Sequence, residues 1–400
     1  MSCKSDININ PHFKKNVQEL VQTHRFDAPV YVTRPHIPTL ETYAKALSPA
    51  WERQWLTNDG ILHTELELAL AARFDVPSLR LFCNGTVALL TALLALDLED
   101  GEVITTPFTF AATVNTLYWR RLRPVFCDID PYSCNLDPAG IEAKITSKTR
   151  AILPVHVYGR PCDVESIQAI ADRHGLPVLY DAAHAFDVEY KGRSLLHYGT
   201  LSMLSFHATK LFNTAEGGAL ASPNAQLHDP LKKLKNFGIE GEDTIIAPGI
   251  NGKMSELHAA LGLTQLENVG EEIEGRRRIA IYYNERLAAV SGLALPKFDS
   301  DTIKSNYAYY PLRVDGEAYG MNRNLLQLHL QEFNVHARRY FHPLCSTSSW
   351  CLVEPGRLPI AEKAAQEMLC LPLYGTLSLE SAAVICDIIM QLGAIAHKTL

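Results

Sequence analysis

The sequence predicts an α/β protein in which a large domain with a mostly parallel β-sheet precedes a smaller α+β domain. A chain of 400 residues is too long for one ordinary core, which indicates two domains. Short apolar runs alternate with helical patterns from about residue 35 to residue 250, as in β–α–β crossover units. These runs lack polar alternation, as expected of strands that are buried on both faces.

The predicted elements follow this division of the chain. Residues 1–30 form a polar N-terminal arm with one short helical stretch, HFKKNVQELVQTHRF. In the large domain, residues 31–252, the strand candidates are 79–83, 102–106, 123–129, 150–158, 176–182, 201–207 and 217–222. Helical stretches lie between them at 86–96, 111–121 and 163–175. In the small domain, the elements are a long helix from Met254 to about Ala289, strands at 306–314 and 335–341, and helices at 323–334, 359–369 and 378–393.

Composition excludes several classes of protein. The chain is 47% hydrophobic and 20% charged, which excludes wholesale disorder, and its net charge of −7 disfavours a nucleic-acid-binding protein. The longest uncharged apolar run, residues 87–96, is too short to cross a membrane, and the polar N-terminus lacks an export signal. Nine scattered cysteines without a CxxC pair fit neither a disulfide framework nor a zinc cluster. We therefore expect a cytoplasmic protein without a metal.

Lys210 is the first candidate catalytic residue. It follows an apolar strand in SFHATKLFNTAEGGA (205–219), in a turn of small and polar residues. A lysine that attacks a carbonyl needs partial desolvation and a depressed pKa, which the end of a strand at the rim of a parallel sheet provides. On this segment alone, an ordinary surface lysine is an equally good interpretation.

Asp181 ends the apolar strand of LPVLYDAAHAF (176–186). A carboxylate there can cap a helix, bind a metal or pair with a cationic ring nitrogen, and the lack of a nearby ligand cluster disfavours the metal. Pyridoxal phosphate chemistry needs at least two groups: a carboxylate that pairs with the protonated pyridine nitrogen and a lysine that forms a Schiff base. His184 lies within reach of the phenolic oxygen of that cofactor; the alternative is a hydrogen-bonded histidine of the core.

A strand, an Asn-Gly-Thr turn and an apolar helix follow one another in FCNGTVALLTALLAL (82–96). Backbone N–H groups at the start of this helix, with the hydroxyl of Thr86, form an anion site, to which the hydroxyl of Ser205 can add, unless Thr86 is a simple N-cap. Neither GxGxxG nor GxxxxGK[ST] occurs, which disfavours a dinucleotide or triphosphate site. Phe110 in PFTFAAT (107–113) is placed to stack on a flat ring, whereas Phe108 fits the core.

In their order and in their amino-acid sequences, these segments resemble the DegT/DnrJ/EryC1/StrS family of sugar aminotransferases. These are pyridoxal phosphate enzymes of fold type I, the fold of aspartate aminotransferase. The resemblance runs from about Val32 to Leu392. It is carried by VTRPHIPTLE (32–41), WLTNDG (55–60), NGTVAL (84–89), EVITTPFTFAAT (102–113), PVFCDIDP (124–131), HVYGRPCDV (156–164), DAAHAF (181–186), SFHATKLFNTAEGGA and NGKMSELHAALGLTQL (251–266).

The resemblance implies that Lys210 binds the cofactor as a Schiff base and shuttles the proton, while Asp181 holds the pyridine nitrogen. The other implied cofactor contacts are Gly85, Thr86 and Ser205 for the phosphate, Phe110 for the ring face, and His184, where many members carry glutamine, for the phenolic oxygen. Asn251 matches an asparagine that reaches the phosphate in the neighbouring subunit. A homodimer with two shared sites follows.

Selected segments are most similar to enzymes that aminate C4 of a dTDP-linked 4-keto-6-deoxyglucose: WLTNDG, HVYGRPCDV, SFHATK, EGGA and VHARRYF. The implied reaction moves the amino group of L-glutamate to C4 and gives dTDP-4-amino-4,6-dideoxy-D-glucose for O-antigen or deoxyaminosugar synthesis. The alternatives are a 3-aminotransferase acting on a dTDP-3-keto-6-deoxyhexose, or an enzyme for a UDP-linked keto sugar. Family members that dehydrate C3 carry histidine in place of the lysine, and Lys210 argues against that reaction.

The diphosphate of such a substrate needs a local cation, because the net charge is negative. In the predicted strand VHARRYFHP (335–343), Arg338 and Tyr340 share one face and Arg339 points away. The resemblance places an arginine at position 338 near the mouth of the site. The alternative is a surface arginine that pairs with Glu332 or another carboxylate.

Overall fold

The computed structural model describes residues 11–354 and 356–399. Its large domain is built on seven strands: β2 (Ser78–Phe82), β3 (Glu102–Thr105), β4 (Arg123–Phe126), β5 (Thr149–Leu153), β6 (Leu179–Asp181), β9 (Leu201–Ser205) and β10 (Gly218–Ser222). They form the hydrogen-bonded groups β2-β10-β9-β6 and β4-β3-β5, and parallel bridges join β5 to β6. Among these strands, β10 is antiparallel to β2 and β9 and the remaining pairs are parallel. The mostly parallel sheet predicted from the sequence is confirmed.

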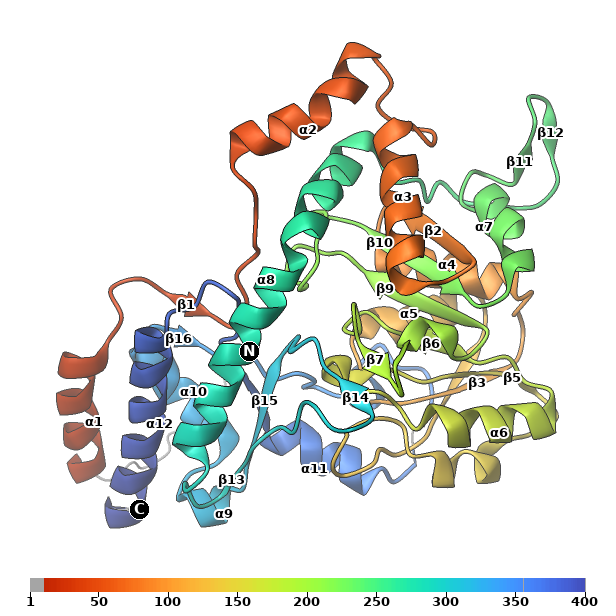
Figure 1. Cartoon of the computed structure of the whole chain (residues 1–400). Coiled ribbons are helices and arrows are strands. Elements are labelled where there is room, and N and C mark those ends of the chain that lie inside the picture. The colour runs from red at the N-terminus through yellow and green to blue at the C-terminus, as the bar shows by residue number, and fades with distance from the viewer. Residues whose placement is uncertain (1–10, 355, 400) are drawn as a thin grey trace.

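Helices cover this sheet and connect its strands (Figure 1). Of these, α4 (Gly85–Ala95), α5 (Ala111–Trp119) and α6 (Val164–His174) were expected, whereas α3 (Ile61–Phe74) and α7 (His228–Leu234) were not. The helix α2 (Leu40–Glu52), also not expected, projects away from the sheet and contacts α8 and α3. Short strands add local pairs: β7 (Glu189–Tyr190), β8 (Arg193–Ser194), β11 (Ile239–Glu240), β12 (Thr244–Ile245) and β14 (Ile303–Lys304). The strands expected at 123–129 and 150–158 end early, at Phe126 and Leu153, where the chain turns into loops.

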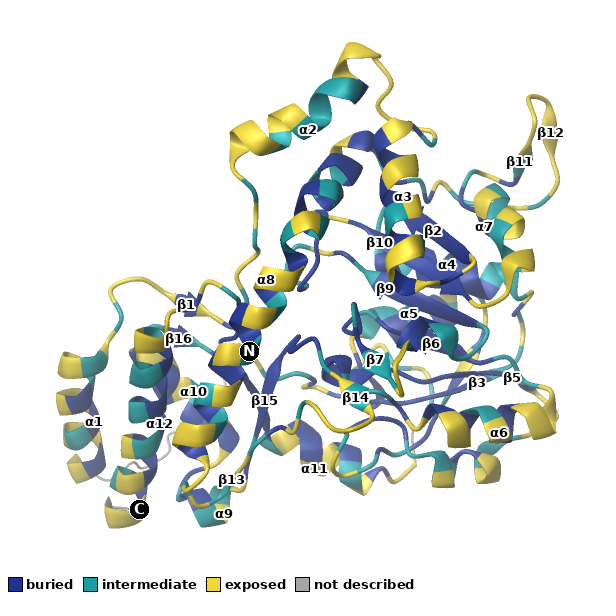
Figure 2. Ribbon diagram, in the orientation of Figure 1, coloured by how far each residue is buried: buried dark blue, intermediate teal, exposed yellow. Residues whose placement is uncertain are grey.

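The long helix α8 (Glu256–Leu287) connects the two halves of the molecule. Ala259, Ala260 and Val269 near its start belong to the core under the large sheet. Ile279 and Tyr283 near its end belong to the core of the C-terminal half. Figure 2 shows buried faces along much of α8. One helix therefore contributes to both cores.

The C-terminal half combines an antiparallel sheet, in the order β13-β15-β17, with helices. Its elements are β13 (Leu293–Ala294), β15 (Tyr310–Val314), α9 (Gly316–Tyr319), α10 (Arg323–Glu332), β16 (Val335–His336), α11 (Pro359–Glu367), β17 (Met368–Leu371) and α12 (Leu379–Thr399). Here three sequence predictions were wrong. The strand expected at 306–314 begins only at Tyr310. The strand expected at 335–341 stops at His336 and continues only as a bridge between Arg338 and Cys370, and the end of the helix expected at 359–369 is part of strand β17.

The N-terminal helix α1 (Pro11–His24) lies against α12, and β1 (Val30–Tyr31) pairs in parallel with β16. Among the described residues, α12 is the one helix long and apolar enough to cross a membrane, by length and composition. Its side chains Ile385, Ile388 and Ile389 are buried in the C-terminal core. The domain boundaries at residues 30 and 252 remain predictions.

Candidate active site

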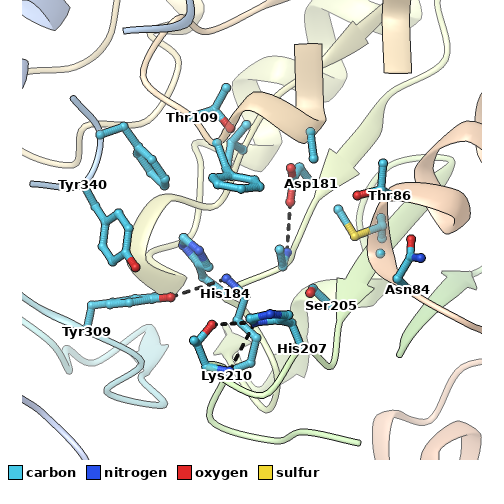
Figure 3. Close-up of a pocket in the computed structure, with 18 of the residues that line it drawn as sticks. Asn84, Thr86, Thr109, Asp181, His184, Ser205, His207, Lys210, Tyr309 and Tyr340 are labelled. Atoms are coloured by element: carbon cyan, nitrogen blue, oxygen red, sulfur yellow. Dashed lines mark hydrogen bonds between the residues drawn. The ribbon is translucent and has the colours of Figure 1, made fainter. Parts of the chain in front are cut away.

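A cavity of about 340 Å³ opens where strands β6 and β9 end and helix α4 begins. Figure 3 shows side chains from both halves of the molecule around it. Asp181, Ser205 and Lys210 come from the large sheet and the loop that follows it, and Tyr309 and Tyr340 come from the C-terminal half. The carboxyl ends of strands in an open α/β sheet are the usual position of a ligand site.

One end of the cavity has the form of an anion site. Asn84 caps α4 by accepting a hydrogen bond from the N–H of Val87 at 2.8 Å, so Thr86 is not the N-cap that one interpretation of the sequence made it. A Cβ on Gly85 would lie 3.1 Å from the Cβ of Ser205, and this close approach brings the Ser205 side chain beside the helix N-terminus. Gly85, Thr86 and Ser205 therefore line the same end of the cavity.

Asp181 is buried at the end of β6. Its Oδ2 accepts a hydrogen bond from the hydroxyl of Thr113 at 2.7 Å, and its Oδ1 accepts one from the N–H of Ala183 at 3.1 Å. Burial raises the pKa of this carboxyl, and the hydrogen bonds and the charge of Lys210 oppose that rise. A cationic ring nitrogen opposite the carboxylate would favour its ionised form further. Thr113 was not predicted as a site residue, although it ends the PFTFAAT segment.

Lys210 lies in the turn that follows β9, where its N–H donates to the carbonyl of His207 at 2.8 Å. Its Nζ donates to the hydroxyl of Tyr309 at 3.4 Å. Burial lowers the pKa of the Lys210 amine, and the negative charge of Asp181 raises it in part. A buried amine with a lowered pKa is equipped to act as a nucleophile or a base.

His184 follows Asp181 by three positions and is buried against aromatic rings. Its Nδ1 accepts a hydrogen bond from the N–H of Tyr158 at 3.2 Å, and its ring is parallel to that of Phe341. Burial lowers the pKa of the imidazole well below its ordinary value. A neutral ring whose Nδ1 accepts carries its proton on Nε2, so His184 offers a hydrogen-bond donor at Nε2.

Two phenylalanines of the PFTF segment lie in different environments. Phe110 is 64% exposed, precedes helix α5 and lines the cavity. Phe108 is fully buried and packs edge-on against Tyr158 and Phe341. Of these two residues, the structure thus places Phe108 in the core and leaves Phe110 available to a ligand.

Arg338 and Tyr340 line the cavity from the C-terminal half, with the Arg338 guanidinium 5.7 Å from the centre of the Tyr340 ring. Arg339 instead donates to Asn324 at 3.3 Å. Glu332, the suggested partner of Arg338, pairs with His329 at 3.1 Å, and in the described part of the chain no carboxylate lies within 4.0 Å of the Arg338 guanidinium. Arg338 is therefore a cation available at the mouth of the cavity.

Asn251 does not line the cavity of its own chain. It is exposed and forms a backbone bridge with Asn236, and the carbonyl of the adjacent Gly252 accepts from the N–H of Cys83 at 2.8 Å. Within residues 11–354 and 356–399, no group of three or more metal-ligating side chains occurs.

The sequence profile of the DegT/DnrJ/EryC1/StrS aminotransferase family matches residues 40–390. The chain belongs to this family. The family, its fold type and its dependence on pyridoxal phosphate, all expected from the sequence, are confirmed.

Several relatives cover nearly the whole chain. It is 41% identical over 368 residues to the dTDP-4-amino-4,6-dideoxy-D-glucose transaminase of Shigella dysenteriae, covering 92% of this chain and 100% of the relative. The Escherichia coli enzyme of the same name is 42% identical, with 91% and 99% covered. Among solved structures, DesI in the presence of its TDP-sugar product has a TM-score of 0.87 at 35% identity, covering 92% of this chain and 94% of DesI.

Proposed function

We propose that this enzyme transfers the amino group of L-glutamate to C4 of dTDP-4-keto-6-deoxy-D-glucose. The main support for transamination is that one cavity contains the Lys210 amine, the buried Asp181 carboxylate and the N-terminus of α4. The position of amination is supported by the names of the Shigella and Escherichia coli relatives. The product would serve O-antigen or deoxyaminosugar synthesis.

The residues of the cavity fit pyridoxal phosphate. Gly85, Thr86 and Ser205 would bind its phosphate at the N-terminus of α4, where backbone N–H groups and the helix dipole favour an anion. Asp181 would pair with the ring nitrogen, and the Nε2–H of His184 would donate to the phenolic oxygen. Phe110 would cover one face of the ring.

When bound, pyridoxal phosphate accepts electron density from the carbon that loses its proton. Lys210 would take that proton from Cα and return it at C4′ of the cofactor, and burial lowers the pKa of its amine, which favours the neutral form that accepts a proton. Asp181 favours the cationic ring nitrogen through its negative charge. The same residues act in the opposite order when the sugar is aminated.

The experiment that tests this function is a matched assay with dTDP-4-keto and dTDP-3-keto 6-deoxyhexoses and with a UDP-linked keto sugar. We expect turnover of the dTDP-4-keto sugar, with the new amine at C4 by NMR. A relative from Pseudomonas aeruginosa, 34% identical over 81% of this chain, is a UDP-2-acetamido-2-deoxy-3-oxo-D-glucuronate aminotransferase, which is why the UDP sugar is included. Amination at C3, or preference for the UDP sugar, would contradict the proposal.

Arg338 is proposed to bind the diphosphate of the sugar nucleotide, with Tyr340 beside it. We expect Arg338→Ala to raise the KM for the sugar nucleotide roughly tenfold or more, because a charge-assisted hydrogen bond to phosphate is lost. The glutamate half-reaction should change little, and the neighbouring Arg339→Ala variant serves as the control. Single-turnover measurements of each half-reaction check this. A loss confined to the glutamate half-reaction would assign Arg338 to the carboxylate of the amino donor.

We also propose a homodimer in which Asn251 completes the phosphate site of the partner subunit. Its exposed position outside its own cavity supports this. An apolar face at one edge of the chain, on and beside α2 and α3, also supports this proposal (Figure 2). Its exposed side chains are Trp51, Trp55, Ile61 and Leu68. An exposed apolar patch is typical of an interface between subunits.

A mixed dimer tests the shared sites. We expect a hybrid of Lys210→Ala and Asn251→Ala chains to keep about half of the wild-type activity, because one site carries both substitutions and the other carries neither. The two homodimeric variants are the controls. Very low activity of a verified hybrid would show that both residues act in the site of one chain.

The proposed location is the cytoplasm, with no membrane or nucleic acid as partner. The cysteines among the described residues are all free, which fits a reducing compartment. The net charge of −7 fits a partner that is bound by local cations rather than through a general basic surface.

A further inference from the structure

We propose that Tyr309 is a positioning residue for Lys210: its hydroxyl holds the lysine amine whenever Lys210 is not attached to the cofactor. This inference rests on the proposed function of Lys210 as the proton shuttle. In transamination the amine is released during each half-reaction, and a flexible lysine must then stay directed at one reaction centre.

The contact joins the C-terminal half of the chain to the loop that carries Lys210. The Tyr309 hydroxyl lies 3.4 Å from the Lys210 Nζ, and the tyrosine side chain is only 4% exposed. Figure 3 shows the hydroxyl directed at this amine. No other hydrogen-bond partner of the hydroxyl lies among the residues that the structure describes. Catalytic hydrogen bonds are often long before the ligands bind and shorten in the loaded site.

The ring of Tyr309 is fixed by packing. Its centre lies 4.7 Å from that of His184 and 5.5 Å from that of Tyr340, with the rings tilted by 58° and 79°. The Tyr158 ring lies on a further side at 6.2 Å. Because these contacts restrict the ring, the direction of the hydroxyl is set by the fold rather than by Lys210.

Burial raises the pKa of the Tyr309 hydroxyl, so it stays neutral near pH 7. A neutral hydroxyl that accepts one N–H of Lys210 leaves the lone pair of the neutral amine free to take a proton. The same oxygen accepts from the ammonium after the proton has been taken. Tyr309 can therefore hold Lys210 in both protonation states. The other titratable groups that face Lys210 are Asp181, His184 and Tyr340.

Tyr309→Phe removes the hydroxyl and keeps the ring. Tyr310→Phe is the matched control, because Tyr310 is the next residue and its hydroxyl donates instead to Asn284 at 2.8 Å in the C-terminal core. We expect Tyr309→Phe to lower the maximal rates of both half-reactions about tenfold or more, with both KM values changed less than about twofold. Tyr310→Phe should leave these rates unchanged.

The second measurement does not depend on turnover. In the pyridoxamine form of the full-length enzyme, Lys210 is free, and its pKa can be followed by NMR of ¹³Cε-labelled lysine, assigned with Lys210→Arg. We expect Tyr309→Phe to lower this pKa by about one unit, because the ammonium loses an acceptor. Stopped-flow rates of the glutamate half-reaction should show the same shift in their pH profile.

An unchanged Lys210 pKa in Tyr309→Phe would overturn the inference. Equal effects of the two tyrosine substitutions would indicate a structural role and would also overturn the inference. A change confined to the KM of the sugar nucleotide would make Tyr309 a substrate contact and would overturn it in the same way. If the wild-type enzyme fails to aminate the 4-keto sugar, the proposed function fails. The NMR comparison would still decide whether Tyr309 holds Lys210.

Discussion

Lys210→Ala is expected to abolish turnover, with a fall in rate of at least about a thousandfold, because the group that moves the proton is lost. The anion site at α4 and the Asp181 carboxylate are unchanged by the substitution, so the variant should still bind the cofactor. Rapid-mixing kinetics measure the rate. The absorption band of the lysine-bound cofactor, which borohydride removes from the wild-type protein, should be absent from the variant.

Lys363→Ala provides the matched control for this substitution. Lys363 lies on α11, its side chain is 65% exposed, and it pairs with Glu367 at 3.7 Å. We expect this variant to retain wild-type activity. A near-normal rate in Lys210→Ala would rule out the transaminase mechanism.

Asp181→Asn is expected to lower the rate roughly 10²- to 10³-fold, because the neutral amide no longer stabilises a positive charge on the ring nitrogen. The amide has nearly the shape of the carboxylate: its Oδ1 can still accept from the N–H of Ala183, and its Nδ2 can donate to the hydroxyl of Thr113, which then accepts, so the fold should remain intact. Stopped-flow measurement of the glutamate half-reaction tests the rate, and circular dichroism tests the fold.

Asp163→Asn is the corresponding control, because Asp163 caps α6 by accepting from the N–H of Ser166 at 3.1 Å and asparagine is an equally good N-cap. Activity should be unchanged in this variant. Wild-type activity of Asp181→Asn would mean that Asp181 serves only the structure of the loop.

The strands of the central sheet could be predicted from the sequence because their signals are local. Each strand of the central sheet is a short apolar run, and Asp181 and Lys210 follow such runs directly, so both are brought to one edge of the sheet. Tyr309 lies within NYAYYPLRV (306–314), which the sequence analysis predicts as a strand, and nothing in that segment marks this tyrosine as a site residue. Its approach to Lys210 depends on how the two halves of the chain pack, and no local pattern encodes that.

Helix α3 illustrates a second limit of sequence patterns. Its segment ILHTELELALAARF buries Leu62, Leu66 and Leu70 but exposes Ile61 and Leu68. Apolar residues on both sides weaken the 3.6-residue period by which an amphipathic helix is found. A face that is apolar and exposed in one chain is the pattern expected where a second subunit packs, and a single sequence does not distinguish it from core.

The helix α8 has a consequence for how the molecule loses its structure. Because its first turns pack under the large sheet and its last turns pack in the C-terminal core, melting of either core removes the support of half of this helix. Denaturation of one half is thus expected to destabilise the other half through the shared helix. Since Asp181 and Tyr309 come from opposite halves, the catalytic pocket would be lost as soon as either half denatures.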